Sequence, residues 1–95
     1  MARPPTLVDL PLRLAGNGPL RHRIADAVVA AIGTGSLQPG DLLPPSRALA
    51  RQLAVSRGSV VAAYDELLAA GFVESQAGSA TRVAPGADHA ARSGA

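Results

Sequence analysis

The chain has 95 residues, with nine basic residues against seven acidic ones, a formal net charge of +2 and no cysteine. This length allows a single small domain, and the missing cysteine excludes disulfides and thiolate metal sites. All nine basic residues are arginines, so no lysine can form a Schiff base with pyridoxal phosphate or a carbonyl substrate.

Residues 1–17 are predicted to form an extended arm, because three prolines interrupt the segment and no helical period is sustained. The segment also lacks the basic-then-apolar run of a signal peptide, and no apolar run in the chain approaches ~18 residues. We therefore expect a cytoplasmic protein that has no membrane partner.

The first helix is predicted to start near Pro19 and to end at Gly33 and Gly35. Apolar side chains within it recur at helical spacing and would face a core. A turn is predicted at residues 37–40, where proline precedes glycine in an order that suits a type II turn.

The segment 46–60 has the pattern of a helix-turn-helix. Leu49 and Leu53 lie four residues apart, so they share one face of a short second helix. Ser46 and Ser56 each occupy a position suited to an N-cap. Two helices joined by only three or four residues must cross steeply, which is the helix-turn-helix arrangement.

The third helix is predicted from about Arg57 to Ala70, with Gly71 as the residue that ends it. The apolar period then changes to alternation, which predicts strands at 72–75 and 81–83 joined by a loop of hairpin length. The buried stripe of the third helix is expected to contain Val60, Ala63, Tyr64, Leu67 and Leu68.

Residues 85–95 have no apolar pattern and are predicted to be a flexible tail or linker. The expected fold is mainly α with a small β-hairpin. It is a winged helix-turn-helix over residues 18–84, with three helices and a two-stranded wing.

Two arginines are the strongest candidates for DNA contact. Arg57 would lead the third helix, the end that meets base edges in the major groove, and its pairing with guanine is the commonest specific base contact. Arg47 would open the second helix, where a cation opposes the helix dipole, so a DNA contact explains it better than a plain surface role. Gly58 would let the backbone approach a groove closely.

The remaining candidates each have a structural alternative. The hydroxyls of Ser46 and Ser59 either bind phosphate or only cap helices. Arg82 on the wing either follows the DNA backbone or is simply solvated, and the hairpin tip either enters a minor groove or forms an ordinary turn. The candidate DNA-binding residues are Arg47, Ser56, Arg57, Gly58, Ser59, Gly78, Ser79 and Arg82.

Catalysis and metal binding find little support in the sequence. His22 and His89 have no paired carboxylate or second ligand at metal spacing, and no serine has a positioned base. The only aromatic residues, Tyr64 and Phe72, are too few to stack single-stranded bases. We therefore expect no enzyme and no metal site, and a partner of double-stranded DNA.

The chain resembles the GntR-type bacterial transcription regulators over about residues 19–84. The run 60–67 and the early Leu10-Pro-Leu12 are similar to the MocR subfamily. The elements that match the family are Leu37-x-Pro39-Gly40-Asp41-x-Leu43-Pro44-Pro45-Ser46-Arg47, Leu49-Ala50, Val55-Ser56-Arg57 and Gly78-Ser79-x-Thr81.

This resemblance implies a winged helix that binds operator DNA, normally as a homodimer on paired half-sites. It assigns DNA contacts to Arg47, Arg57, Gly58, Ser59 and, on the wing, Gly78. MocR-like proteins also carry a C-terminal domain similar to fold-type I aminotransferases, which binds pyridoxal phosphate and supplies dimerisation. That domain would be absent from this chain, so we expect no cofactor within it.

The sequence departs from the family pattern at four positions. Glycine is common where Ala54 stands, and if the backbone is left-handed there, alanine costs roughly 1–2 kcal/mol. Gly58 replaces a polar residue, and Gln76 and Ala80 replace an arginine and a glycine of the wing.

The leading hypothesis is sequence-specific binding of double-stranded DNA by a GntR/MocR-like transcription regulator. The third helix would enter the major groove and the wing would lie near the minor groove. The alternative is a protein-interaction module, in which the winged helix docks a partner through its third helix.

Overall fold

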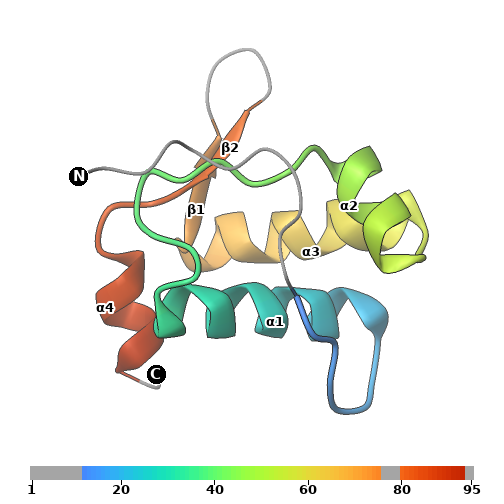
Figure 1. Ribbon diagram of the computed structural model, residues 1–95, viewed down its shortest axis with the longest axis horizontal. Coiled ribbons are helices and arrows are strands. Elements are labelled where there is room, and N and C mark those ends of the chain that lie inside the picture. Colours follow the sequence, from blue (N-terminus) through green and yellow to red (C-terminus); the bar gives the residue numbers. More distant parts are fainter. Residues whose placement is uncertain (1–11, 76–79, 94–95) are drawn as a thin grey trace.

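A computed structural model describes residues 12–75 and 80–93. Helix α1 (Leu20–Thr34) lies beneath helix α3 (Arg57–Ala70), and helix α2 (Ser46–Leu53) packs at the start of α3 (Figure 1). Strands β1 (Val73–Ser75) and β2 (Thr81–Val83) form an antiparallel sheet, and a short helix, α4 (Ala87–Arg92), follows. The predicted winged helix-turn-helix is confirmed.

Helix α1 supplies the floor of the core. Its buried side chains are Ile24, Ala25, Val28, Ala31 and Ile32. The helix ends at Gly35, whose φ of 89° is the left-handed geometry that closes many helices. Pro19 is the N-cap rather than the first helical residue, and Gly33 lies inside the helix instead of ending it. No helix in residues 12–75 and 80–93 is long and apolar enough to cross a membrane.

Proline fixes where α2 begins. Pro45 has φ −55° and ψ 146° and occupies the N-cap position, so Ser46 becomes the first helical residue. The prediction that Ser46 is an N-cap is therefore wrong. The reason is that the Pro44–Pro45 pair holds the backbone extended up to residue 45, and Ser46 can already adopt helical angles.

The turn between α2 and α3 depends on Ala54. Its backbone is left-handed, with φ 58° and ψ 44°, and its N–H donates to the carbonyls of Ala50 and Arg51. Ser56 then caps α3 as predicted, because its Oγ accepts a hydrogen bond from the N–H of Ser59 at 3.1 Å. Helix α3 ends at Gly71, also as predicted.

The core-facing stripe of α3 is narrower than the sequence suggested. Val60, Ala63, Tyr64 and Leu67 are buried, but the side chain of Leu68 is 38% exposed. The prediction that Leu68 belongs to the core is wrong. Successive helical residues are about 100° apart, so Leu68 lies one step beyond the face that Leu67 presents to α1.

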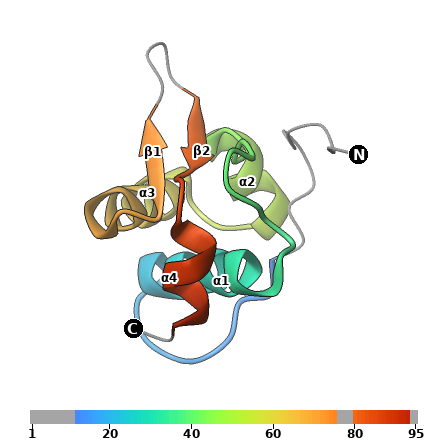
Figure 2. The same ribbon diagram turned by 90° about the vertical axis from the view of Figure 1, so that its left-hand side faces the viewer.

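The sheet is anchored to the segment that leads into α2. In the sheet, Glu74 faces Arg82 across the two strands. On the other side of β2, Leu42 forms an isolated bridge with Arg82. Three backbone hydrogen bonds of 2.8–2.9 Å join residues 40–43 to β2. Figure 2 shows the two strands rising away from the helices as a wing.

The segment after the wing is not the tail that the sequence predicted. Residues Ala87–Arg92 form α4, which lies across one end of α1 (Figure 2). Ala87 is only 2% exposed, and Ala91 packs against the core beside Gly33. The apolar residues of this helix are all alanines, which give little hydrophobic pattern but allow close packing of helices.

The N-terminal arm is described only from residue 12. Residues 12–19 contain no helix or strand, and Leu12 and Leu14 pack against the core. Residues 1–11, including the Leu10 of the early motif, lie outside the described part of the chain.

Candidate nucleic-acid interface

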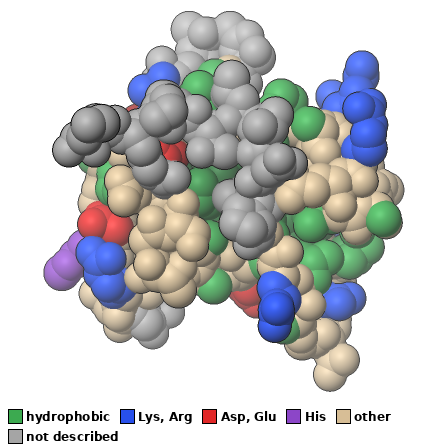
Figure 3. All heavy atoms as spheres, in the orientation of Figure 1, with side chains coloured by type: hydrophobic (Ala, Val, Ile, Leu, Met, Phe, Trp, Pro, Cys, Tyr) green, Lys and Arg blue, Asp and Glu red, His purple; other side chains and the backbone are tan. Residues whose placement is uncertain are grey.

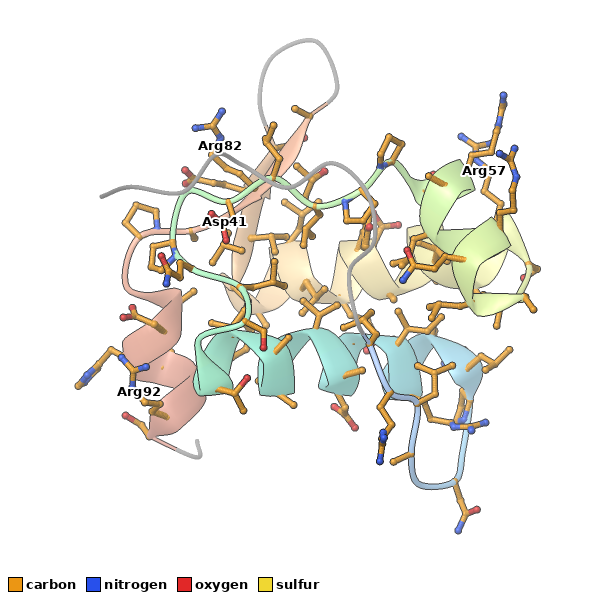
Figure 4. All side chains as sticks on the ribbon, in the orientation of Figure 1. Asp41, Arg57, Arg82 and Arg92 are labelled. Carbon is orange, nitrogen blue, oxygen red and sulfur yellow. The ribbon has the colours of Figure 1, made fainter. Side chains whose placement is uncertain are left out.

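Arg57 lies where the helix-turn-helix pattern placed it. It is the first residue of α3, its side chain is exposed, and it projects outward from the upper side of the molecule (Figure 4). Its Nε–H donates to Oγ of Ser46 at 3.3 Å. This contact holds the side chain at the α2–α3 junction and leaves the two terminal NH2 groups of the guanidinium available to acceptors on a base edge.

Arg47 lies at the neighbouring helix start. It is the second residue of α2 and is exposed, directly after the Ser46 that contacts Arg57. The chain contains no lysine, and arginine side chains gather over α2 and the start of α3 at the upper right of Figure 3. The fold therefore brings together the starts of two helices and two cationic side chains.

The small residues at the start of α3 divide into two groups. The hydroxyl groups of Ser56 and Ser59 form a hydrogen bond, with their oxygens 2.9 Å apart, and Ser56 also caps the helix. Gly58 does not cap the helix or contribute a side-chain hydrogen bond. A Cβ added there would meet no heavy atom within 4 Å, so the fold itself does not require glycine.

Arg82 lies on the wing and the hairpin tip lies outside the described residues. Arg82 belongs to β2, is partly buried, and projects from the upper side of the molecule at the opposite edge from Arg57 (Figure 4). Arg92, by contrast, projects from the lower left end on α4. Gly78 and Ser79 fall in the segment 76–79, for which no structure is described.

A groove of about 540 Å³ separates α3 from the wing. Five residues of α3 line it at spacings of three or four, which places them on one side of the helix: Arg57, Val61, Tyr64, Asp65 and Leu68. Residues 43–46, which end at the first residue of α2, and the wing residues Ser75, Ala80 and Thr81 form the other walls. Val61 and Leu68, at 39% and 38%, are the exposed large hydrophobic residues of the described chain.

Sequence reasoning missed this groove because α3 carries apolar residues on more than one face. The predicted stripe included Val60 and left out Val61, in agreement with their burial and exposure. No local pattern showed that the wing and residues 43–46 would border a groove beside Val61. The available signal was the spacing of Val61, four residues after Arg57.

One buried tyrosine links α3 to the segment before α2. The hydroxyl of Tyr64 donates to the carbonyl oxygen of Pro44 at 2.7 Å, and both residues are buried. Burial raises the pKa of this phenol well above its ordinary value. This hydrogen bond joins α3 to the pair of prolines before α2. It therefore helps to hold the helix that carries Arg57 in place beside the start of α2.

The side of α3 next to α1 holds an ion cluster that the sequence did not predict. Glu66 contacts Nδ1 of His22 at 2.7 Å and Nε of Arg21 at 3.2 Å. His22 therefore does have a carboxylate partner, contrary to expectation, supplied from 44 residues away in the sequence. The cluster is partly solvent-exposed, and within the described ranges no group of three or more His, Cys, Asp or Glu could hold a metal ion.

Comparison with known proteins gives a consistent result. Residues 20–83 match the family model for bacterial regulatory proteins of the gntR family. The chain is 42% identical over 81 residues to the HTH-type pyridoxine biosynthesis transcriptional regulator PdxR of Corynebacterium glutamicum, covering 83% of this chain and 18% of that protein. It is also 42% identical over 66 residues to the probable rhizopine catabolism regulatory protein MocR of Rhizobium meliloti, covering 70% of this chain and 13% of that one. The chain thus spans less than a fifth of the length of these two relatives.

Solved structures with the same fold include a complex with DNA. YtrA from Sulfolobus acidocaldarius, a GntR-family transcription factor, superposes with a TM-score of 0.71 at 32% identity, covering 84% of this chain and 82% of that one. The DNA-binding domain of AraR in complex with operator ORR3 superposes with a TM-score of 0.67 at 26% identity, covering 84% of this chain and 96% of that one.

Proposed function

The chain belongs to the gntR family of bacterial regulatory proteins, and from this membership we propose that it binds operator DNA sequence-specifically, as the DNA-binding domain of a transcription regulator. The observation that carries the proposal is the placement of Arg57. Its guanidinium is exposed at the first residue of α3 and held by Ser46, on the same side of the molecule as the wing.

In the proposed mechanism, α3 enters the major groove with its first turn foremost. Arg57 reads a guanine, and Arg47 contacts DNA from the adjoining start of α2. The open backbone at Gly58 allows close approach, while the N–H groups at the start of α3 favour a phosphate. Ser56 and Ser59 would add phosphate contacts beyond their capping role.

The wing would lie beside the neighbouring groove. Arg82 projects from the same upper side as Arg57, which supports a contact with the DNA backbone next to the site that α3 reads. We assign Gly78 to the minor groove on the strength of the family motif, and Ser79 because it follows Gly78 in the predicted hairpin loop.

We further propose that binding occurs on paired half-sites by a homodimer in the cytoplasm. Half-sites one helical turn apart would be separated by ~34 Å, which requires two copies of this domain. Pyridoxal phosphate, if the whole regulator is MocR-like, would bind outside this chain, because a chain without lysine offers no side-chain amine for a Schiff base.

The test begins with an operator selected from a random duplex pool. The variant Arg57→Ala should bind that operator about tenfold to a hundredfold more weakly and lose preference at one base pair of each half-site. Arg92→Ala is the matched control, because it removes an arginine from the far end of the molecule and should leave both measurements unchanged. Equal loss by Arg57→Ala on operator and random duplex would contradict a base-reading role.

A protein-interaction module is the second candidate. The observation in its favour is the pair of exposed apolar side chains, Val61 and Leu68, on the groove face of α3. Titration with a random duplex separates the two candidates. Binding that weakens steeply with salt supports DNA, because contacts with phosphates release counterions. Binding that is absent or insensitive to salt supports the protein partner.

A further inference from the structure

Val61 is exposed without a structural reason. It is 39% exposed, while its neighbour Val60 is fully buried and supplies the core contact of this turn of α3. An apolar, β-branched side chain in water gains nothing for the folded monomer. Val61 lines the groove between α3 and the wing.

The position of Val61 relates it to Arg57. The two residues are four apart, so Val61 lies ~6 Å further along the helix axis and on nearly the same face. Both line the same groove. A duplex whose base edge meets the guanidinium of Arg57 therefore presents the next one or two base pairs to Val61, since base pairs are stacked ~3.4 Å apart.

The chemistry of valine selects among base edges. In the major groove the purine edges and cytosine expose hydrogen-bonding groups, whereas thymine adds the C5-methyl group. A valine pressed against a polar edge removes water and returns no hydrogen bond, which carries a free-energy cost. The branched side chain is also stiff at χ1, so it cannot easily turn away.

We propose that Val61 is a specificity-determining residue that contacts the C5-methyl group of a thymine, within about two base pairs of the guanine read by Arg57. This inference rests on the proposed function and extends it by naming the second base of the half-site. Double-stranded DNA, rather than a protein, is the occupant because the contact surface is continuous with that of Arg57.

Base contact by α3 should end soon after Val61. The next exposed residue on this face is Asp65, whose carboxylate repels phosphates, and Leu68 lies nearly a further turn away. Leu68 has the same exposure as Val61 to within one percentage point, at 38% against 39%. It therefore serves as a matched control that differs in position and not in accessibility.

The experiment replaces each thymine of the selected operator by deoxyuridine, which removes only the methyl group. With the unaltered protein, one replacement per half-site should weaken binding about threefold to tenfold. The sensitive thymine should lie within two base pairs of the position at which Arg57→Ala loses its base preference. Val61→Ala should weaken binding to the thymine operator by a similar factor and should no longer distinguish thymine from deoxyuridine.

Two further variants complete the test. Leu68→Ala should keep the full thymine preference, and Val61→Thr should keep most of it because threonine retains one methyl group. The inference is overturned if the selected operator has no thymine in that window, or if Val61→Ala responds to deoxyuridine as the unaltered protein does. In either case Arg57-dependent binding to the operator would leave the proposed function standing. Failure of the unaltered protein to bind any duplex would overturn both.

Discussion

Ala54 is the most strained residue of the helix-turn-helix. It is the one non-glycine residue with positive φ among residues 12–75 and 80–93, and it closes the turn between α2 and α3. A Cβ in this left-handed conformation costs roughly 1–2 kcal/mol. The turn keeps its shape because the N–H of Ala54 is bonded to two carbonyls of α2 and Ser56 caps the next helix.

Ala54→Gly should therefore stabilise the protein. The relief of strain is partly offset by about 0.4–1 kcal/mol, because glycine makes the unfolded chain more flexible. We expect a net gain of about 0.5–1 kcal/mol in the free energy of unfolding, measured by chemical denaturation. Gly71→Ala, at φ 84°, introduces the same strain and should destabilise the protein by a similar amount. Loss of stability in both variants would show that alanine is not strained at position 54.

Single residues were predictable from sequence where local chemistry decides their role. Ser56 comes just before a helical pattern and Arg57 begins it, which predicts the cap and the first helical residue. Both lie at these positions in the structure. The prediction that Ser46 is an N-cap was wrong, because the prolines before it shift the N-cap to Pro45. The prediction for Leu68 was wrong, because the width of the buried stripe depends on which face of α3 meets α1, and packing decides that.

A buried hydrogen bond joins α3 to the segment before α2. Tyr64 of α3 donates to the carbonyl of Pro44, twenty residues earlier in the chain and just before α2. Proline has no N–H and its carbonyl lies outside any helix ladder, so the phenol is the partner that satisfies it. The bond thereby couples the orientation of α3 to the start of α2.

Tyr64→Phe removes the donor and leaves the buried carbonyl of Pro44 without its partner. We expect a loss of about 1–3 kcal/mol in the free energy of unfolding, since the ring still fills its place in the core. Operator affinity should fall only modestly under conditions where the variant is folded. A stability equal to that of the unaltered protein would mean that water replaces the phenol at this carbonyl.

Tyr64 should also make the protein sensitive to alkali. Burial raises the pKa of the phenol in the folded state, so the folded protein keeps its proton at pH values where the unfolded chain loses it. The stability contributed by this group is full below the unfolded value of about 10 and falls as the pH rises beyond it. The chain has no lysine or cysteine and only one tyrosine, so no other side chain should titrate near this pH.

The measurement is a set of denaturation curves at increasing pH, with phenolate absorbance read in parallel. In the unaltered protein, absorbance should rise together with unfolding and not before it. Tyr64→Phe should remove the decline in stability between about pH 10 and 12. Ionisation of Tyr64 in a protein that is still folded would contradict the buried hydrogen bond.

Elements with a clear apolar period were predictable from the sequence, whereas α4, which has no such period, was not. The third helix was predicted within its observed bounds, Arg57–Ala70, because its apolar stripe and its terminal glycine agree. Helix α4 was missed because alanines carry little hydrophobic signal and its partner surface on α1 is distant in sequence. The bridge from Leu42 to the wing is likewise a long-range contact that no local pattern encodes.

The whole molecule is organised with its candidate DNA face at one side and α4 at another. Arg57 and Arg82 project from the upper side of Figure 4, and Arg92 of α4 projects from the lower left. Ala87 of α4 is almost fully buried, so α4 closes the core near the end of α1 and contributes to stability without touching the groove.

Ala87→Asp tests this division. A carboxylate at a buried position should lower the free energy of unfolding by about 2–4 kcal/mol. Ala90→Asp places the same charge in the first turn of the same helix at an exposed position, and should change stability by less than about 0.5 kcal/mol. At a temperature where both variants are folded, both should bind the operator like the unaltered protein. Equal stability of the two would mean that α4 does not pack on α1 in solution.

The pairing of residues 40–43 with β2 also bears on how the protein avoids aggregation. Strand β2 has a partner on each side, β1 on one and the 40–43 segment on the other, so its backbone groups are not offered to a second chain. The outer edge of β1 is three residues long and has the exposed carboxylate of Glu74 at its centre. Short, charged edges resist strand addition. If two copies of this domain bind adjacent half-sites, as proposed, these protected edges would keep their sheets from joining.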